Sequence, residues 1–399
     1  RLLVNARTYA EGDPGLPRAL AAIYEAGQRP RCLCVAGGVE MYIAKHRDHV
    51  VKRMPGSGHL HHAACPSFEP PPRQSGLGEL LGQAVIEHAP DAIELRVRFP
   101  LERAPGRCAA KAEPASPGEV RVQHKQMSLR ALTHFLFERA GFNRWTPAMA
   151  GRRGQGAVHK YLSEAALEIL VKGWRLSDRL YVPEPFQQAT QNEVCTRRRR
   201  KLAFLHEDRG GERFGMAVLI GEFKHCDTGA AGRRLWIKHM PDTPLLVPAK
   251  TWTRIERLYA PLLEACDADA EQRPKLVVTA LIRARREHTY GVEAASLMLA
   301  HPQWVPVEGA HELPLIDALI AQQRRFVKPL RYDADEAAAF ANALLLDAGR
   351  DPVPLHVVSE FVAPREKAAK ARALHALQAT PWVWHTGTPM PPLPPVTAP

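Results

Sequence analysis

The chain has 399 residues, enough for two or three domains, because single hydrophobic cores stop growing at about 250–300 residues. Hydrophobic residues make up 45% of the chain, a share that excludes a mainly disordered protein. No apolar run reaches the length of about eighteen residues that a membrane helix needs, and residues 1–15 lack the apolar core of a signal peptide. We therefore expect a cytoplasmic protein that does not bind a membrane.

The charge of the chain is strongly unbalanced. Fifty-four Lys and Arg residues face 42 Asp and Glu residues, so the formal net charge is +12 at pH 7. A basic excess of this size favours a polyanionic partner, nucleic acid first, because phosphate contacts release condensed counterions. The alternative is a GC-rich genome that encodes Arg, Ala and Pro abundantly, without any such partner.

Two cysteines one residue apart, Cys32 and Cys34, are followed about thirty positions later by His61-His62-Ala-Ala-Cys65. Three thiols and one imidazole form a ligand set that Zn²⁺ prefers in closed tetrahedral sites. The residues between the two pairs alternate in polarity around a turn, which predicts a β-hairpin that brings the pairs together. The pattern therefore predicts one structural zinc ion held by Cys32, Cys34, Cys65 and either His61 or His62. In the alternative interpretation the cysteines are small core residues and the histidines are solvated.

Proline- and glycine-rich stretches divide the chain, and together its patterns predict an α+β protein of several domains. A small zinc-binding β-hairpin module comes first, a central helical region follows, and a mixed α/β region completes the fold. The expected parts are residues 1–103 with the zinc module at about 30–70, a linker at 104–118, a helical module at 119–190, a mixed α/β region at 191–388 with a subdomain at 308–388, and a proline-rich tail at 389–399.

The helical module is expected to contain three helices. Ser128 can cap a helix over 129–140, Pro147 suits a first helical position, and apolar residues recur at helical spacing over 157–172. Three short helices with basic residues near their middle connection predict a helix-turn-helix or winged module that contacts DNA. An ordinary helical bundle with a solvated basic rim is the alternative. The candidate phosphate contacts here are Arg152, Arg153 and Lys160.

The mixed region begins with a run of five basic residues. We expect the segment 196–205 to end as a strand, so the run would either follow a phosphate backbone or lie solvated where the strand starts. The run consists of Arg197, Arg198, Arg199, Arg200 and Lys201. Further strands are expected over 214–224, 235–239, 275–282 and 291–299, and a helix over 252–266.

A metal-dependent nuclease is the enzymatic alternative for the same region. Nucleases of the PD-(D/E)XK class place an aspartate at one strand and Glu-x-Lys on the next, so that the carboxylates hold Mg²⁺ and the lysine helps to activate water. Asp208, Glu222 and Lys224 have this order. Because Glu-x-Lys is short and common in basic proteins, and because Asp208 falls in an expected turn, a structural role is the stronger interpretation.

The C-terminal part resembles a degenerate, restriction-endonuclease-like PD-(D/E)XK core in the order of its elements. Those elements are a helix over 312–326, strands over 340–347 and 353–358, a helix over 366–378 and a strand over 382–384. Where the class has its proline and aspartate, this chain has Ala341 and Asn342, and His356 begins the segment that replaces Glu-x-Lys. The resemblance implies a pseudo-nuclease that keeps the scaffold, with Glu312 and Asp347 as the remaining candidate metal ligands.

Four segments resemble an uncharacterised domain-of-unknown-function family of bacterial proteins encoded on integrative and conjugative elements. They are CLC with HHAAC over 32–65, RWTPAMAGRRGQ over 144–155, RRFVKPLRYD over 324–333 and PWVWHTGTPMPPLPP over 381–395. The resemblance spans nearly the whole chain. It implies an accessory protein of a mobile genetic element, which makes DNA the more natural nucleic acid.

The sequence as a whole predicts a zinc-stabilised protein that binds nucleic acid and has no active site of its own. A third possibility, beside this one and the nuclease, is a protein-interaction scaffold, in which the proline-rich tail, Trp382 and Trp384 dock a partner protein. The sequence leaves the oligomeric state open.

Overall fold

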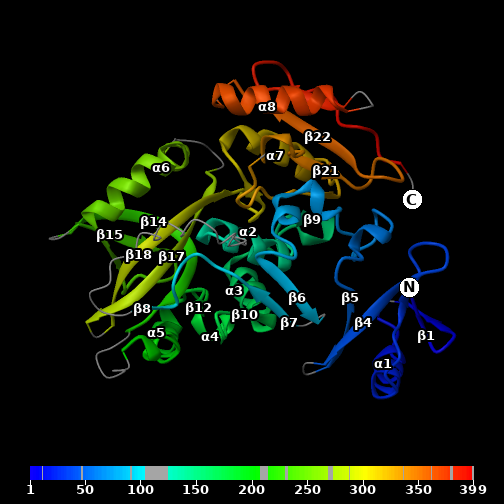
Figure 1. Ribbon diagram of the computed structural model, residues 1–399, viewed down its shortest axis with the longest axis horizontal. Helices are drawn as coiled ribbons and strands as arrows, with labels where there is room; N and C mark the ends of the chain where they lie inside the picture. Colours follow the sequence, from blue (N-terminus) through cyan, green and yellow to red (C-terminus); the bar gives the residue numbers. More distant parts are fainter. Residues whose placement is uncertain are drawn as a thin grey trace, which may run out of the picture.

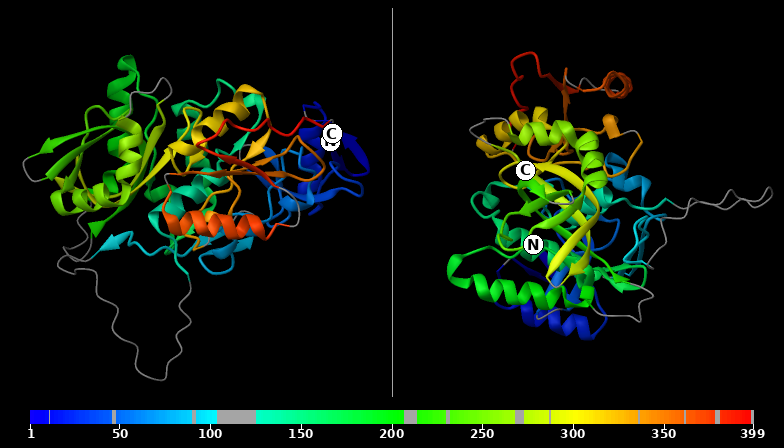
Figure 2. Two further views of the ribbon diagram at one scale, coloured as in Figure 1. Left: turned by 90° about the horizontal axis from the view of Figure 1, so that it is seen from above. Right: turned by 90° about the vertical axis from the view of Figure 1, so that its left-hand side faces the viewer.

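The computed structural model describes residues 1–397 apart from residues 11, 46–47, 90–91, 104–124, 207–213, 230–231, 268–272, 287, 336, 361 and 378–380. The molecule is elongated, with a small N-terminal sheet at one end and a curved sheet of residues 217–300 at the other (Figures 1 and 2). Within the described segments, no helix is both long and apolar enough to cross a membrane. The expected linker at 104–118 lies outside the described residues.

A five-stranded sheet and one helix form the N-terminal domain. The strand order is β2-β1-β3-β4-β5, and antiparallel pairing of β4 with β5 confirms the predicted hairpin. Helix α1 (Leu16–Glu25) buries Leu20 and Ile23 against Val4 and Tyr9. The strands are β1 (Leu2–Val4), β2 (Arg7–Tyr9), β3 (Arg31–Cys32), β4 (Val39–Lys45) and β5 (His49–Arg53).

The central region combines two longer helices with a four-stranded sheet of order β11-β10-β7-β6. Helix α2 (Leu129–Arg139) begins at the expected cap, where the Ser128 hydroxyl accepts a hydrogen bond from the Ala131 amide at 3.1 Å. The other elements are α3 (Gln155–Ala165), α4 (Leu176–Arg179), β6 (Val85–Ala89), β7 (Ala92–Leu95), β8 (Glu102–Arg103), β10 (Ile169–Val171), β11 (Trp174–Arg175) and β12 (Leu180–Tyr181).

The predicted three-helix module is wrong in two places. A single 3₁₀ turn over Pro147–Met149 stands where the middle helix was expected. The third helix ends at Ala165, and the apolar run Ile169–Val171 instead pairs parallel with β7. The spacing of apolar residues does not distinguish the last turn of a helix from a short buried strand. Pairing with β7 makes this segment a strand. Helices α2 and α3 are therefore parts of a mixed α/β layer.

Five long strands of the mixed region close into a ring. They are β14 (Ala217–Gly229), β15 (Gly232–Ile237), β16 (Leu245–Pro248), β17 (Lys275–Arg286) and β18 (Thr289–Ala300). The first half of β14 pairs with β17 and its second half with β15. Strand β15 pairs with β16, β16 runs parallel to β18, and β18 pairs with β17. Helix α6 (Ala249–Asp267) connects β16 to β17, and we call this unit the barrel.

Alternating residues of the barrel strands face two different cores. Leu219 and Val278 belong to the core inside the barrel, whereas Val218 and Val277 belong to the core that contains α2. Successive side chains of a strand point to opposite faces, and α2 packs on the outer face of β17 and β18. The outer face of β15 carries no such cover, since Arg234 on the strand and Lys238 directly after it are exposed.

The basic run of residues 197–201 lies on a helix, so the predicted strand is wrong. Helix α5 (Gln191–Lys201) buries Val194 and Arg198, which are four residues apart and therefore share one helical face. Arg and Lys have high helix propensity, so a helix built largely of charged residues is stable once one face packs. Strand β13 (Phe214–Gly215) follows and pairs with β8.

The C-terminal sheet has the order β23-β22-β21-β20-β9. Its two helices and the strands β21, β22 and β23 follow the order expected for residues 312–384, but the first helix ends at Ala321 and the short strand β20 was not expected. The elements are β9 (Arg144–Trp145), α7 (Leu313–Ala321), β20 (Phe326–Val327), β21 (Ala343–Leu345), β22 (Val353–Val358), α8 (Pro364–His375) and β23 (Trp382–His385), with β19 (Pro306–Val307) pairing on the barrel. The tail returns along this sheet, because Trp382 Nε1 donates to the Pro392 carbonyl at 2.9 Å and Arg324 Nη1 donates to the Pro394 carbonyl at 2.7 Å.

Candidate functional site

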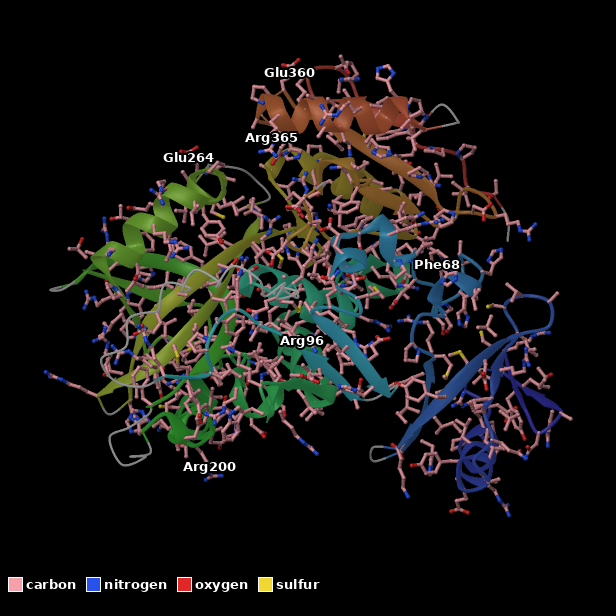
Figure 3. The ribbon with its side chains drawn as sticks, viewed as in Figure 1. Phe68, Arg96, Arg200, Glu264, Glu360 and Arg365 are labelled. Atoms are coloured by element: carbon pink, nitrogen blue, oxygen red, sulfur yellow. The ribbon has the colours of Figure 1, made fainter. Side chains whose placement is uncertain are left out.

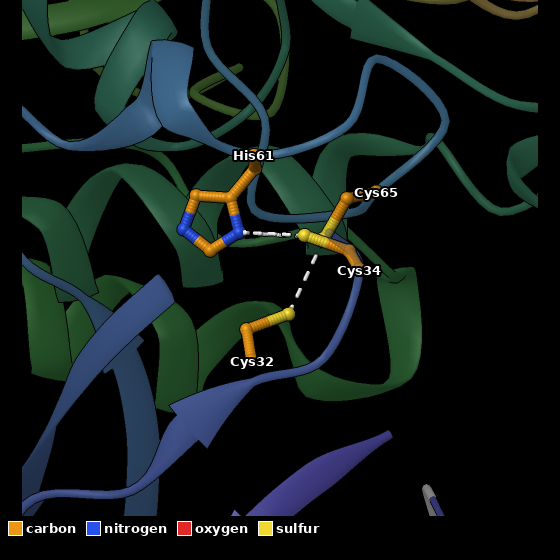
Figure 4. A group of neighbouring side chains, drawn as sticks. All are labelled: Cys32, Cys34, His61 and Cys65. Atoms are coloured by element: carbon orange, nitrogen blue, oxygen red, sulfur yellow. Dashed lines mark hydrogen bonds between the residues drawn. The ribbon is translucent and has the colours of Figure 1, made fainter. Parts of the chain in front are cut away.

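Four side chains of the N-terminal domain converge on one point, which we call the metal cluster: Cys32, Cys34, His61 and Cys65 (Figure 4). Their ligand atoms all lie within 4.8 Å of one another. The Sγ atoms of Cys32 and Cys65 are 3.7 Å apart. Nδ1 of His61 lies 3.3 Å from the Cys34 sulfur and 3.7 Å from the Cys65 sulfur. These four residues could hold one metal ion.

Three separations in the metal cluster are close to those of a tetrahedral zinc site. A Zn–S distance of about 2.3 Å and a Zn–N distance of about 2.0–2.1 Å place two sulfurs about 3.8 Å apart and a sulfur–nitrogen pair about 3.6 Å apart. The observed 3.7, 3.3 and 3.7 Å agree with this arrangement. A disulfide needs sulfurs about 2.05 Å apart, so the cysteines are free thiols.

The metal cluster is assembled from two backbone segments that the fold brings together. Cys32 ends strand β3, which pairs with β1 and β4, and a turn with positive φ at Gly37 and Gly38 follows Cys34. Cys65 lies in a turn in which its own sulfur accepts a hydrogen bond from the Ser67 amide at 3.4 Å. This is the hairpin arrangement that the sequence predicted for the two ligand pairs.

Arg144 holds the Cys65 turn against the rest of the molecule. This residue of strand β9 donates from Nη1 to the carbonyls of Cys65 and Pro66 at 3.2 and 2.8 Å. The buried cluster around the cysteines also includes Val327 of β20 and Leu346. The metal cluster therefore lies where the N-terminal domain joins the C-terminal sheet.

The protonation states of the metal cluster suit a cation. Burial and the neighbouring Cys65 raise the pKa of the Cys32 thiol to about 12, so a thiolate there requires a compensating positive charge. Burial, assisted by the charge of Arg53, lowers the pKa of His61 and keeps its imidazole neutral. Neutral imidazole is the form that binds a metal. Binding would therefore release protons from the cysteines and none from the histidine.

His62 does not join the metal cluster. Its Nδ1 accepts a hydrogen bond from the Ala64 amide at 3.2 Å and so stabilises the turn that precedes Cys65. The sequence offered both histidines at plausible spacings. Only the backbone conformation at residues 61–65 decides between them, and it directs the ring of His61 inward (Figure 4).

A family described as "Protein of unknown function (DUF1173)" matches residues 3–387. The chain belongs to the DUF1173 family. This confirms the expected membership of a family of unknown function over nearly the whole chain. Neither the curated proteins nor the solved structures contain a significant match to the chain. For this DUF1173 protein, function therefore has to be argued from the arrangement of its own residues.

Arg153 of the DUF1173 chain is a structural residue. Its Nη atoms donate to the carbonyls of Phe142 and Gly141 at 2.9 and 3.0 Å and also to that of Arg144. Its guanidinium lies over the rings of Phe142 and Trp145, 5.4 and 5.3 Å from their centroids. Arg152, next to it, is exposed. The phosphate contact predicted for Arg153 is therefore no longer proposed, whereas Arg152 and Lys160 remain on the surface.

Replacing Arg153 by Ala should lower the free energy of unfolding by about 3 kcal/mol, because buried carbonyls would lose charged donors. Replacing the adjacent Arg152 by Ala should change it by less than about 0.5 kcal/mol, since that side chain is exposed. Urea unfolding of the two variants measures the difference. Equal effects would contradict the structural role of Arg153.

The basic residues of α5 also divide into engaged and exposed ones. Arg198 is 2% exposed and forms an ion pair with Asp242. Arg197 pairs with Glu184 at 2.8 Å, and Lys201 donates to the Ser177 carbonyl at 2.7 Å. Arg199 and Arg200 are exposed, and Arg200 projects from the edge of the molecule in Figure 3. Of the predicted run, these two side chains are the most accessible to phosphate.

The residues of the nuclease alternative are not arranged as a metal site in the part of the chain that the structure describes. Glu222 is buried on β14 and pairs with Lys238 at 2.5 Å and with Lys275 at 3.4 Å. Lys224 is exposed on the same strand, and Asp208 lies outside the described residues. A carboxylate that two lysines already compensate has little need of Mg²⁺.

The two carboxylates of the C-terminal part are likewise compensated. Asp347 accepts hydrogen bonds from Arg324 Nε and Nη2 at 3.1 and 2.9 Å. Glu312 is 1% exposed and pairs with Lys328 at 3.2 Å. Asn342 stands where a PD-(D/E)XK nuclease has its aspartate. Both remaining carboxylates, Asp347 and Glu312, already have basic partners in the protein. These residues therefore build the scaffold.

The outer face of the barrel carries a group of basic and aromatic residues that no sequence motif marks. The rings of His225 on β14 and Trp236 on β15 stack, with centroids 5.6 Å apart and planes inclined by 20°. Three basic side chains surround them, and all three are exposed: Lys224, Arg234 and Lys238. We call these five residues the barrel face. Strand alternation around the buried Leu235 and Ile237 was the one signal for it in the sequence.

Proposed function

We propose that this protein binds single-stranded nucleic acid through the barrel face, without catalysing a reaction, and that one structural Zn²⁺ stabilises its N-terminal domain. The observation that carries the proposal is the stacked His225–Trp236 pair, flanked by exposed basic residues on an uncovered strand surface. Aromatic rings on which bases stack, combined with positive charge along the backbone path, are the usual means of binding single strands.

The connectivity of the barrel supports this proposal. Its strands follow the ring order β14-β15-β16-β18-β17, β16 and β18 are parallel, and α6 lies between the third and fourth strands in sequence. This is the connectivity of an OB-fold, a small Greek-key barrel that binds oligonucleotides on the face of its second and third strands and in adjoining loops. The second and third strands here are β15 and β16. Shared connectivity by itself is only an analogy of fold. Nucleic-acid binding is inferred from the aromatic and basic residues of the barrel face.

The barrel face combines paired and unpaired basic side chains: Arg234 pairs with Asp227 at 2.8 Å and Lys238 pairs with Glu222 at 2.5 Å. Asp227 accepts hydrogen bonds from Arg234 Nε at 2.8 Å and from Trp236 Nε1 at 3.2 Å, which fixes both side chains. Lys224 has no ion pair with any described residue. Near the turn of the β17–β18 hairpin, Arg285 and Arg286 are exposed as well. Together with the net charge of +12, these residues favour a polyanion.

The zinc part of the proposal rests on the donor set of the metal cluster. Three thiolates and one imidazole would fill all four positions of a tetrahedral Zn²⁺ and leave none for water, so the ion would be structural. The ion would cross-link strand β3, which carries Cys32, to the turn that carries Cys65. The N-terminal domain could then keep its position on the C-terminal sheet.

Two further parts of the proposal rest on the sequence resemblance. We infer that the protein works in the cytoplasm as an accessory protein of a mobile genetic element, which makes single-stranded DNA the first substrate to test. The C-terminal sheet would serve as a pseudo-nuclease scaffold. Arg152, Lys160, Arg199 and Arg200 would supply additional phosphate contacts from the surface.

A fluorescently labelled 15-nucleotide oligothymidylate, titrated with protein at increasing salt, tests the function. We expect affinity that falls steeply with salt, because phosphate contacts release counterions. Trp236→Ala should weaken binding by about tenfold or more, since one base–aromatic stack contributes about 1–3 kcal/mol. Trp236→Phe should retain most of the affinity, although both variants lose the hydrogen bond to Asp227.

Equal binding by the Ala and Phe variants would contradict stacking on Trp236, and salt-independent or absent binding would remove the proposal altogether. Cleavage of the oligonucleotide in Mg²⁺ that is lost in Glu222→Ala would favour the nuclease instead. The scaffold alternative is weakened because both indole N–H groups have partners within the chain: Trp384 donates to the Thr388 carbonyl at 2.9 Å, and Trp382 donates to the Pro392 carbonyl of the tail.

A further inference from the structure

We propose that the groove between α2, α6 and β18 binds a nucleoside phosphate. The groove has a volume of about 630 Å³, within the range of about 300–1,000 Å³ that is typical of small-molecule sites. It is lined by both charged and apolar side chains and lies on different strands from the barrel face. The inference therefore goes beyond the proposed function and can hold or fail independently of it.

Four basic side chains from three separate parts of the chain meet in this groove: Arg98, Arg130, Lys250 and Arg254. Lys250 and Arg254 lie one turn apart at the start of α6, and both are exposed. Arg130 comes from the start of α2, where it pairs with Glu308 at 3.0 Å. Charges brought together from distant segments, at the mouth of one cavity, favour an anionic ligand.

The two carboxylates of the groove already have partners in the protein. Asp333 accepts hydrogen bonds from the Ser128 amide and hydroxyl at 2.9 and 2.6 Å and pairs with Arg98, another groove residue, at 3.4 Å. Glu293 pairs with Arg103 at 3.2 Å and with Arg283. Neither Lys250 nor Arg254 has an ion pair with a described residue. The unmatched charge of the groove is therefore positive, which suits phosphate and disfavours a metal cation.

Apolar side chains line the groove as well, and a kink in α6 interrupts the helix that contributes some of them. Pro261 lacks a backbone N–H and interrupts the helix, and Tyr259 has non-helical angles (φ −125°, ψ 17°). The Tyr259 hydroxyl is 3.2 Å from Ser296 Oγ on β18, which fixes its ring at the groove. Phe99 and Ile255 line the same cavity. A lining that combines aromatic, aliphatic and cationic side chains matches a ligand with a planar base and a phosphate group.

The ligand of the groove is either a free nucleotide or one nucleotide of a bound strand. Competition between a nucleoside diphosphate and an oligonucleotide distinguishes the two. The probes are the four ribonucleoside diphosphates, with the matching nucleosides as phosphate-free controls, measured by calorimetry on the full chain. We expect at least one diphosphate to bind about tenfold or more tightly than its nucleoside. Arg254→Gln should raise the Kd of that diphosphate about tenfold, because the variant loses one charged hydrogen bond to phosphate.

Arg257→Gln is the matched control, because Arg257 is exposed on the same helix and does not line the groove. It should change binding by less than about twofold, and both variants should unfold at the same urea concentration as the wild type. Displacement of the diphosphate by oligothymidylate would identify the ligand as a nucleotide of the strand, and no displacement would identify a free nucleotide. Absence of binding by all four diphosphates, or equal effects of the two substitutions, would overturn the inference.

Discussion

Replacing Cys32 and Cys34 together by Ser should abolish zinc binding, whereas the wild-type protein, purified without a metal-affinity tag, should contain about one zinc ion per chain. The two thiols are half of the metal cluster, and a tetrahedral site that keeps only His61 and Cys65 binds zinc weakly. Elemental analysis of both proteins measures this difference directly. The expected effect is large, because a structural metal would supply folding free energy to a small domain.

Loss of zinc should also unfold the region around the metal cluster. In zinc-finger peptides structural zinc contributes an apparent binding free energy of about 10–16 kcal/mol near pH 7. The core beside the cluster is small and includes Met41, Ala63 and Phe68. Without the ion, backbone amides of β3–β5 should exchange their hydrogens much faster, while those of β17 in the barrel should keep their protection.

The matched control for this prediction is the pair Cys195→Ser and Cys226→Ser, made together. These two cysteines are half-buried free thiols outside the metal cluster. Their replacement should leave both zinc content and exchange protection of β3–β5 unchanged. Zinc that persists in the Cys32→Ser/Cys34→Ser variant, or reduced wild-type protein without zinc, would refute the metal cluster as a zinc site.

The metal cluster could be predicted from the sequence because its signal is local and chemical. Two thiols one residue apart, followed by a hairpin and a histidine–cysteine pair, are typical of a small zinc module. The choice between His61 and His62 was beyond the sequence, since both spacings are compatible with a ligand. The structure decides it through one backbone hydrogen bond, from the Ala64 amide to His62.

The barrel could not be predicted in the same way, although most of its strands could. The expected strands at 214–224, 235–239, 275–282 and 291–299 are confirmed with shifted ends. What closes the ring is the pairing of β14 with two partners and the two-residue parallel contact of β16 with β18. Pairings between distant segments leave no periodic signal in a single sequence. Residues whose importance depends on that closure, such as His225 and Trp236, were missed for this reason.

Basic residues show a second limit of sequence reasoning. Arg152 and Arg153, like Arg198 and Arg199, are chemically identical neighbours, yet in each pair one is engaged internally and the other exposed. A count of charges predicts a polyanionic partner for the chain as a whole. It does not tell which guanidinium groups support carbonyls and carboxylates of the protein itself. Assignments of individual phosphate contacts therefore require the structure.

Replacing Lys328 by Met should lower the free energy of unfolding by about 3–5 kcal/mol, because it would leave the Glu312 carboxylate buried without its counter-charge. Glu312 and Lys328 are 1% and 2% exposed. Burial by itself raises the pKa of Glu312, yet the charge of Lys328 lowers it below its ordinary value. The carboxylate also accepts hydrogen bonds from Asn342 Nδ2 at 2.5 Å and from the Glu308 amide at 2.9 Å. Urea unfolding of the variant measures the loss.

Glu312→Gln in the Lys328→Met background should restore part of that stability, because a neutral amide no longer needs a cation and its one carbonyl oxygen can still accept one of the two hydrogen bonds. The double variant should therefore be more stable than Lys328→Met alone, an interaction that a double-mutant cycle isolates. Lys367→Met on α8 is the control, since Lys367 is exposed and its replacement should cost less than about 0.5 kcal/mol. Strict additivity of the two buried substitutions would show that the pair is not coupled. Recovery in the double variant would show that Lys328 stabilises the C-terminal region by compensating the charge of Glu312.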